Sequence, residues 1–567
     1  MWKIRPYNTN DEQSFVDNGQ HPLLARLLAQ RNIDIKTVND FIACEYSKLS
    51  HPHTLGGVKQ AARLFGLAYK FKKTIAVIGD YDCDGIISSS MVYELCSSLN
   101  MPCEVFLPCR KKHGYGLNEK TIKAFKYRFK DSIPQVLFIV DSGSNNEKEV
   151  KELKEFGIEH IIIIDHHLVD PNLQSVSADA LINWRLCGSN EMCTCGEVFQ
   201  LIKALRLLTD KVNPLEFLSY AAIGTLADAT SLNIDNRIIV RNGLKESVLN
   251  NVISSGINAI KKASKIYSTD LSATQVLFKI APKINAVGRL ATPDLAFDLI
   301  TEHDIGKAEE KAMILEVCNE ERKKVQKAIE KKAIKMVKDN IDDYKYGIAV
   351  YHEEWHIGVI GIVASKLTEE FNKPTIIAGN LSGIWKGSGR SVEQINVKEI
   401  LDKMPKEMML GYGGHPMAVG YSVKEEHINK LNEEFNKACK SYYDEHEIVE
   451  LHNYYDISIK PQAITYETAR LLQDSLSPYS TEENPEPIFK IKDAIITDAS
   501  LIERDTWKLL KFYVERDGYT SEIEFTMFTD QYGIEINGQK VDVYFTFPIL
   551  TDSRYGNDIT VKDIVGK

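Results

Sequence analysis

Three aspartates stand within five residues of the chain, Asp80, Asp82 and Asp84, directly after an apolar run. Carboxylates at this spacing raise one another's pKa, or need a cation if all of them are to stay ionised. Oxygen ligands suit Mg²⁺ or Mn²⁺, and one or two imidazoles shift the preference towards Mn²⁺. Gly85 permits a sharp turn into a following helix. The segment therefore predicts part of a divalent-metal site.

Other acids and imidazoles can converge on this segment from neighbouring strands and a helix: Asp141, Asp165, His166, His167 and Asp228. For any single Asp after a strand, a helix cap or a solvated turn residue is the commoner explanation. That explanation does not account for the whole set, because it leaves Asp165-His166-His167, after a run of four isoleucines, without a role.

This many oxygen ligands favours two-metal hydrolysis of a phosphate ester, in which one ion generates hydroxide and the other stabilises the leaving oxygen. Such ions lie about 3.5–4 Å apart and share a bridging carboxylate, for which Asp141 is our candidate. The sequence shows neither a phosphate-binding loop of the Gly-x-x-x-x-Gly-Lys-Ser/Thr type nor a Ser-His-Asp nucleophile elbow. ATP hydrolysis therefore has no support.

The elements that must position these side chains form an alternation of short apolar runs and helical stretches, which predicts an α/β fold with a parallel sheet. The strand candidates are Thr74–Gly79, Glu104–Leu107, Val136–Val140 and His160–Ile164. Three of the four end directly in carboxylates. Ligands of open α/β sheets bind outside the carboxyl ends of the strands, so the acids fall where a site is expected.

The rest of the chain predicts further domains. We expect an N-terminal helical segment over residues 1–55, the catalytic α/β domain over 56–300, a long connecting helix over 301–343, a second α/β domain over 344–446 and a small β-barrel over 447–567. Among five aromatic residues of the tail, Trp507, Tyr513, Tyr519, Phe525 and Phe528, we expect more than half to lie in the barrel core.

Composition narrows the class of protein. The 567 residues give a formal charge of 69 − 79 = −10 with 44% hydrophobic residues, which is typical of an ordinary globular protein. No apolar run suggests a membrane span or signal peptide, so a cytoplasmic location with reduced thiols is expected. Net acidity argues against a generic polyanion binder, so any contact with nucleic acid must be local or carried by metal ions.

Several motifs occur in order along the chain: Gly79-Asp80-Tyr81-Asp82-Cys83-Asp84-Gly85, Asp141-Ser142-Gly143, Asp165-His166-His167, Gly224-Thr225-Leu226-Ala227-Asp228 and Gly413-Gly414-His415. Together they resemble the DHH phosphoesterase superfamily with its DHH-associated second domain. Further stretches are similar to the RecJ family of single-strand-specific 5′→3′ DNA exonucleases: Asn319-Glu320-Glu321-Arg322, Trp355-His356-Ile357-Gly358, Lys386-Gly387-Ser388-Gly389-Arg390 and Asn484-Pro485-Glu486-Pro487.

The resemblance implies a role for each matching residue. The metal ligands would be Asp80, Asp82, Asp84, Asp141, His166 and Asp228. Asp165 and His167 would be catalytic, orienting the site and touching the scissile phosphate. The substrate-binding residues would be Arg289, Ser388, Arg390, Gly413, Gly414 and His415, with the 5′-terminal phosphate held by Ser388 and Arg390. Apart from the resemblance, Tyr115 is a substrate-binding candidate, because a ring on a loop between two glycines and after three basic residues could stack on a base. An ordinary salt bridge for Arg289, a hairpin turn for Ser388 and Arg390, and a core-facing ring for Tyr115 are the alternatives.

The implied function is that of an exonuclease using two Mn²⁺ or Mg²⁺ ions, which releases 5′-mononucleotides from single-stranded DNA in DNA repair and recombination. A single-strand-binding protein and a helicase are the candidate protein partners. Two alternatives remain: a phosphodiesterase for dinucleotides or very short RNA, which would not need the barrel, and a non-catalytic replication scaffold, which would not need intact acids. Cys187, Cys193 and Cys195 lack a typical zinc-ligand spacing, and we expect free thiols.

Overall fold

The computed structural model describes residues 2–114, 116–172, 176–251, 253–447, 452–479, 484–504, 507–529, 531–550 and 558–566. The chain divides into two compact units. The first consists of Met1–Asn285, Pro293–Met313 and His452–Lys567, and the second of Ala286–Thr292 and Ile314–Leu451. Among the described residues, no helix has both the length and the apolar character needed to cross a membrane.

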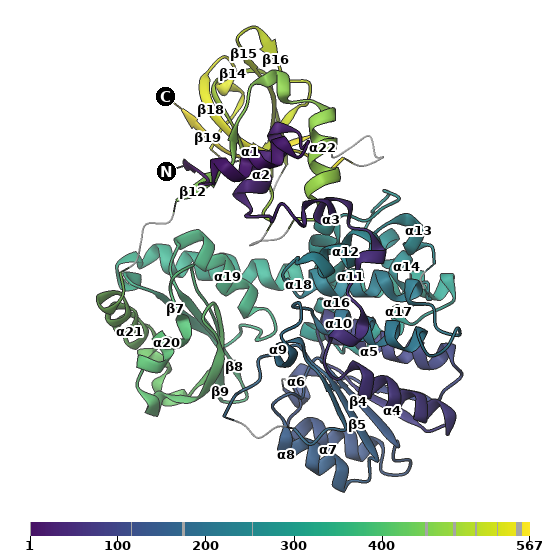
Figure 1. Ribbon diagram of the computed structural model, residues 1–567. Coiled ribbons are helices and arrows are strands. Elements are labelled where there is room, and N and C mark those ends of the chain that lie inside the picture. The colour runs from purple at the N-terminus through teal and green to yellow at the C-terminus, as the bar shows by residue number, and fades with distance from the viewer. Residues whose placement is uncertain are drawn as a thin grey trace. The chain divides into compact units, whose positions relative to one another are not determined.

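A five-stranded parallel sheet lies at the centre of one part of the first unit (Figure 1). Its strands are β2 (Ile75–Ile78), β3 (Cys103–Phe106), β4 (Val136–Val140), β5 (His160–Ile164) and β6 (Ala180–Ile182). They are ordered β3-β2-β4-β5-β6. The α/β fold and the four expected strands are confirmed, and β6 is an addition. This strand order has a topological switch point between β2 and β4, where open α/β sheets bind ligands.

Helices cover both faces of this sheet. They include α4 (Val58–Lys70), α5 (Cys83–Ser98), α7 (Glu119–Arg128), α8 (Glu147–Glu155) and α10 (Thr194–Arg206). On one face, Ile139 packs in a cluster with Phe125 of α7 and Leu153 of α8. On the other, Phe65 of α4 lies edge to face with Phe138, with 6.2 Å between ring centroids. Strands covered on both sides are continuously apolar, which is why the sequence pattern identified them.

A helical region follows the sheet. Its longer members are α11 (Leu218–Ala227), α12 (Ile234–Gly243), α14 (Gly256–Ala263), α16 (Ala281–Leu290) and α17 (Asp294–Ile300). Short helices are α6 (Arg110–His113), α9 (Trp184–Cys187), α13 (Glu246–Leu249) and α15 (Ala273–Gln275). The helix α18 then runs without a break from Ile305 to Asp339, which confirms the long connecting helix.

The second unit contains a mixed sheet in the order β10-β11-β9-β8-β7. Its strands are β7 (Ile348–His352), β8 (Thr375–Leu381), β9 (Ile384–Arg390), β10 (Met409–His415) and β11 (Ala418–Val423). Only β7 and β8 among these described strands pair in parallel. The accompanying helices are α19 (Ile360–Phe371), α20 (Val397–Lys403) and α21 (Leu431–Glu445). This architecture confirms the second α/β fold.

The tail forms a closed barrel, as expected. Hydrogen-bonded neighbours run β14-β18-β19-β17-β15, and β15 pairs with β14 to complete the circle. These strands are β14 (Phe489–Arg504), β15 (Trp507–Arg516), β17 (Phe525–Phe528), β18 (Lys540–Thr546) and β19 (Ile559–Gly566). Flanking elements are β12 (Asn453–Tyr455), β13 (Ile457–Ser458), β16 (Tyr519–Thr520) and α22 (Tyr466–Leu476).

The expectation for the tail aromatics is wrong. Phe525 is fully buried, but Trp507, Tyr519 and Phe528 are 40%, 56% and 71% exposed, and Tyr513 is half-buried. Trp507 and Phe528 instead pack edge to face against each other on the outside, with 5.7 Å between ring centroids. A barrel strand alternates inward and outward residues, and aromatic content alone does not say which set an individual ring joins.

The N-terminal elements share the barrel's hydrophobic core. The elements that contribute to it are α1 (Thr9–Asp17), α2 (Pro22–Gln30) and α3 (Val38–Ala43), which follow the short strand β1 (Trp2–Ile4). Phe15, Leu28 and Phe41 belong to one buried cluster with Phe489 and Phe512 of the barrel. Strand β1 also pairs in parallel with β12. The first and last segments of the chain therefore form one packed body.

Arg237 of α12 ties this body to the helical region. Its side chain is fully buried and lies over the Phe41 ring, 3.9 Å from the centroid. The guanidinium donates hydrogen bonds to four backbone carbonyl oxygens, those of Phe41, Ser475, Leu476 and Pro478. Buried carbonyl groups need such partners, so one side chain satisfies four acceptors from two distant segments.

We expect Arg237→Met to lower the free energy of unfolding of the first unit by about 3 kcal/mol or more, because buried carbonyl groups would lose their donors. Denaturant titration followed by circular dichroism measures the change. Arg63→Met is the matched control, since Arg63 is exposed on α4, and it should leave the unfolding midpoint in place. Equal midpoints for the two variants would contradict the assignment.

Candidate metal centre

Three aspartates lie at the same edge of the parallel sheet. Asp80, Asp141 and Asp165 follow the carboxyl ends of β2, β4 and β5, and all three are almost completely buried. Asp141 has a left-handed backbone with φ of 61°, which is costly for a residue with a side chain. Asp80 and Asp141 flank the switch point, so the topology itself brings their carboxylates together.

The start of α5 adds two more carboxylates. Asp82 is the N-cap of the helix and accepts a hydrogen bond from the Gly85 amide at 3.1 Å, while Asp84 lies buried in its first turn. A side chain at position 85 would come within 2.7 Å of the Asp80 backbone, so only glycine allows the helix to begin so close to the strand. The spacing of the three aspartates is therefore fixed by a strand-to-helix turn.

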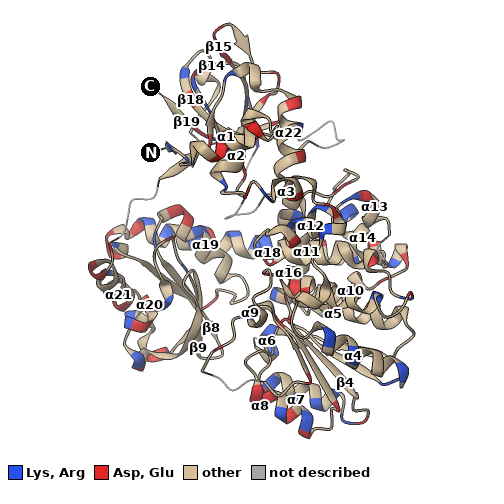
Figure 2. Ribbon diagram, in the orientation of Figure 1, with Lys and Arg blue, Asp and Glu red and all other residues tan. Residues whose placement is uncertain are grey.

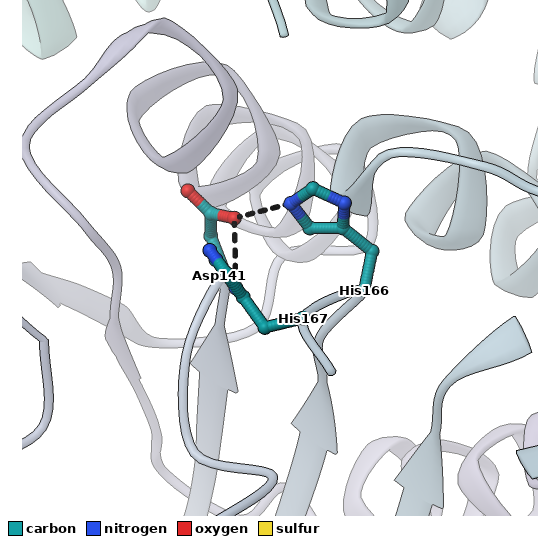
Figure 3. Close-up of side chains that lie close together, drawn as sticks. All are labelled: Asp141, His166 and His167. Atoms are coloured by element: carbon teal, nitrogen blue, oxygen red, sulfur yellow. Dashed lines mark ion pairs between the residues drawn. The ribbon is translucent and has the colours of Figure 1, made fainter. Parts of the chain in front are cut away.

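Two imidazoles meet these acids (Figure 3). His166 Nε2 lies 3.3 Å from Asp141 Oδ1, and His166 Nδ1 lies 3.6 Å from Asp228 Oδ2 at the end of α11. His167 Nδ1 lies 4.0 Å from the same Asp141 oxygen and 2.7 Å from Asp165 Oδ1. Asp141 thus faces both imidazoles.

Three groups of side chains have ligand atoms within 4.8 Å of one another: Asp80 with Asp82 and Asp141, Asp141 with His166 and His167, and Asp84 with His166 and Asp228. Two residues, Asp141 and His166, belong to more than one group. Shared members place the groups side by side, as adjacent ions with a common carboxylate require.

The electrostatics fit divalent cations. Burial and the neighbouring Asp82 raise the pKa of Asp80 to about 8, and burial with Asp84 beside it raises the pKa of Asp228 to about 7. Burial and the charges of Asp82 and Asp84 hold the pKa of Asp141 well above its usual range. One Asp80 oxygen is buried without a hydrogen-bond partner among the described residues. Hard oxygen donors in this state suit Mg²⁺ or Mn²⁺, and the imidazoles favour Mn²⁺.

Asp165 differs from the other acids. Although its burial acts in the opposite direction, hydrogen bonds from His167 and Ser144 lower the pKa of Asp165 to about 2. Burial lowers the pKa of His167, but the hydrogen bond to Asp165 outweighs this and raises it overall. Asp165 is therefore ionised near neutral pH, and it holds the His167 ring through Nδ1 at 2.7 Å.

Several of the predicted substrate-binding residues lie close together within the second unit alone. Across β10, β11 and β9, Gly413 is opposite Gly420, which is opposite Ser388, and His415 is opposite Ala418, which is opposite Arg390. Opposite residues share a face of the sheet, so these side chains form one surface. An Arg390 nitrogen donates to Ser388 Oγ at 3.0 Å.

The start of α19 lies beside this surface. A side-chain atom added at Gly361 would lie 3.0 Å from Ser388 Oγ and 3.2 Å from an Arg390 nitrogen. Arg289 donates to the Gly358 carbonyl at 3.1 Å, just before the helix. A hydroxyl, a guanidinium and a helix N-terminus are the groups that bind phosphate. Gly414, on β10, has a φ of 137° and is exposed. Tyr115, the remaining predicted substrate-binding residue, lies outside the described residues.

Family models match three stretches of the chain: the DHH family N-terminal domain over residues 74–225, the DHHA1 domain over 343–441 and the RecJ OB domain over 455–551. The single-stranded-DNA-specific exonuclease RecJ of Haemophilus influenzae is 30% identical over 490 residues, which cover 83% of each chain. This chain belongs to the RecJ family.

Two further members of the RecJ family show how much of a relative's length this chain covers. RecJ of Bacillus subtilis is 32% identical over 509 residues, which are 88% of this chain but only 62% of that protein. A crystal structure of exonuclease RecJ bound to manganese is 28% identical and superposes with a TM-score of 0.59, covering 69% of this chain and 96% of that one. The chain therefore spans most of one relative and about three fifths of another.

Sequence reasoning missed the part that α10 plays in this RecJ-family site. The amides of Thr194 and Cys195, at the start of α10, donate to the two Asp84 oxygens at 2.8 and 2.9 Å. The Thr194 hydroxyl donates to Asp141 Oδ1 at 3.2 Å. Glu197, buried in the same turn, has a pKa that burial raises well above its usual range. Thr194-x-x-Glu197 before an apolar run is a helix-start signal that could have found them.

Metal binding is expected to tighten as pH rises from about 6 to 8.5. At the lower end of this range Asp80 and Asp228, with pKa values raised to about 8 and 7, hold protons that a cation must displace. Each displaced proton contributes about a tenfold gain in affinity per pH unit.

The same raised pKa values make the metal-free fold less stable as pH rises from about 4 through 8.

Calorimetry with Mn²⁺ in buffers of different ionisation enthalpy counts the protons released. Asp228→Asn should release fewer, and an affinity that is flat across this pH range would contradict the electrostatic account.

Thr194→Val is expected to weaken Mn²⁺ binding by about tenfold, because a hydroxyl that orients the Asp141 carboxylate is lost while the two amide bonds to Asp84 remain. Calorimetry or the electron paramagnetic resonance of free Mn²⁺ measures this without turnover. Thr194→Ser keeps the hydroxyl and should bind like the original protein. Equal affinity in the Val variant would show that the hydroxyl does not position the ligand.

Proposed function

We propose that this chain is a single-stranded-DNA-specific exonuclease that removes 5′-mononucleotides from the 5′ end, with a role in DNA repair and recombination. The observation that carries the proposal is the pair of overlapping ligand groups that share Asp141. Relatives named as exonucleases of this specificity support the choice of substrate. The proposed ligands are Asp80, Asp82, Asp84, Asp141, His166 and Asp228.

Two Mn²⁺ or Mg²⁺ ions held there would supply Lewis-acid activation of water and neutralise charge on the scissile phosphate. Manganese in a related RecJ structure supports this choice of ion. The protein's own part is positional. Asp165 orients the His167 ring through Nδ1, and His167 Nε2 would donate a hydrogen bond to a phosphate oxygen. The hydrogen bond to Asp165 raises the pKa of His167, which favours the protonated ring, the form in which Nε2 as well as Nδ1 carries a proton.

The 5′ polarity would come from the surface around Ser388 and Arg390. A terminal phosphate carries more charge than an internal one, and a guanidinium beside a hydroxyl and the first turn of α19 is suited to bind it. Arg289 and the exposed Gly413, Gly414 and His415 would contact the backbone of the strand. The barrel would hold the strand beyond the site. A single-strand-binding protein and a helicase are proposed as partners from family membership.

Purified protein with Mn²⁺ should degrade a 5′-labelled single strand to labelled mononucleotide, and the same strand in a duplex should survive. EDTA or Asp141→Asn should reduce turnover to background, because the shared carboxylate is removed from both ligand groups. Resolution of products on a denaturing gel over time provides the measurement. Equal degradation of duplex, or faster turnover of a dinucleotide than of a long strand, would refute the proposal.

A further inference from the structure

The second half of α18 carries a charge opposite to that of the whole protein. Residues 322–338 contain eight Lys and Arg and a single acid, Glu330, so this stretch has a formal charge of 8 − 1 = +7 in a chain of −10. Lys and Arg recur along the helix in Figure 2. Such a concentration of one sign on an acidic protein is the local basic surface that a polyanion requires.

These charges are sorted onto one side of the helix. Ile329, Ala333 and Val337 are buried in a core cluster of the second unit. Lys324, Lys327, Lys331 and Lys335, here called the lysine row, are all exposed. Their spacing of three, four and four residues keeps them on one face, about half a turn from the buried residues. The lysine row therefore faces away from the core of its own unit.

The lysine row is electrostatically uncompensated. None of its four lysines makes an ion pair with any residue that the structure describes. Other lysines of the same unit do pair with acids, namely Lys366 with Glu369, Lys403 with Glu445, Lys437 with Glu433 and Lys440 with Asp444. Like charges four residues apart on a helix, such as Lys327, Lys331 and Lys335, repel one another and destabilise the helix. A bound polyanion would remove that repulsion.

We propose that the lysine row binds the phosphate backbone of DNA, outside the residues that hold the reacting phosphate. This proposal rests on the proposed function only in taking DNA as the ligand. Four ammonium groups spread over about 16 Å of helix match a repeating line of phosphates. Lysine is a point charge without the planar fork of arginine, so the contact would be independent of the base sequence, as a nuclease that degrades strands of any sequence needs.

The test replaces all four lysines of the row by Gln in the full chain and measures binding of a long single strand across a range of salt concentrations. Both the variant and its parent carry Asp141→Asn to prevent turnover. Loss of four phosphate contacts should reduce the slope of log affinity against log salt by about 2.8. Gln favours the helix as Lys does, so circular dichroism should show unchanged folding.

The matched control replaces Lys366, Lys403, Lys437 and Lys440 by Gln, which removes the same charge from the same unit but only from lysines that already have partners. Its slope should stay that of the parent. Replacing the lysine row by Arg keeps the charge and should preserve binding. The same binding measurement with a DNA duplex and with anionic vesicles shows whether the lysine row binds single strands, duplexes or lipid phosphates.

A reduced slope on the single strand, with or without the duplex, supports the proposal. An effect seen only with vesicles, or equal slopes for the lysine-row and control variants, would overturn it. In otherwise wild-type protein the lysine-row variant should raise KM for a long strand and leave kcat unchanged. If the wild-type protein degrades no single strand, the proposed function fails; if it does and the variant has the same slope and KM, only the lysine row fails.

Discussion

Carboxylates that are shielded from water repel one another strongly. The arrangement of the residues around the acids of the first unit follows from this repulsion. Asp80, Asp84 and Asp141 are each almost completely buried, and among the described residues no arginine or lysine makes an ion pair with their carboxylates, although Arg110 is near enough to lower the pKa of Asp80. Burying ionised groups without compensation costs several kcal/mol each. The fold stabilises them with backbone amides from α10, with imidazoles from the DHH motif and with protons, until divalent cations replace the protons.

The same constraint explains the close contacts and the restricted backbone around these carboxylates. A strand-to-helix turn requires Gly85, a left-handed backbone is imposed on Asp141, and the first turn of α10 holds Asp84 by two amides. Each of these features either restricts the conformational freedom of the backbone or introduces strain into it, and so lowers the stability of the fold. They are useful together because ligands must be held close to their final geometry before the ions arrive.

Much of this was predictable from sequence for a simple reason. A strand buried on both faces is a continuous apolar run, and an acid at its end is visible one residue later, so β2, β4 and β5 and their aspartates were found together. The contribution of Thr194 was not, because its hydroxyl donates to a carboxylate 53 residues earlier in the chain, and no local sequence pattern marks such a contact. Arg237 looks like any surface arginine in sequence, since its four carbonyl partners come from segments about 200 residues before it and 240 after it. The tail aromatics failed because inward and outward positions of a barrel strand differ by one residue.

The core shared by the N-terminal helices and the barrel has a consequence for synthesis on the ribosome. Leu24, Leu27 and Leu28 of α2 emerge early, yet Phe489 and Phe512, members of the same cluster, are made some 460 residues later. At 5–20 residues per second the gap is roughly 20–90 s, during which an apolar helix face has no native cover. The nascent chain thus carries an apolar segment that the barrel can shield only after some 460 further residues are made, which makes this segment a candidate substrate for chaperones during that interval.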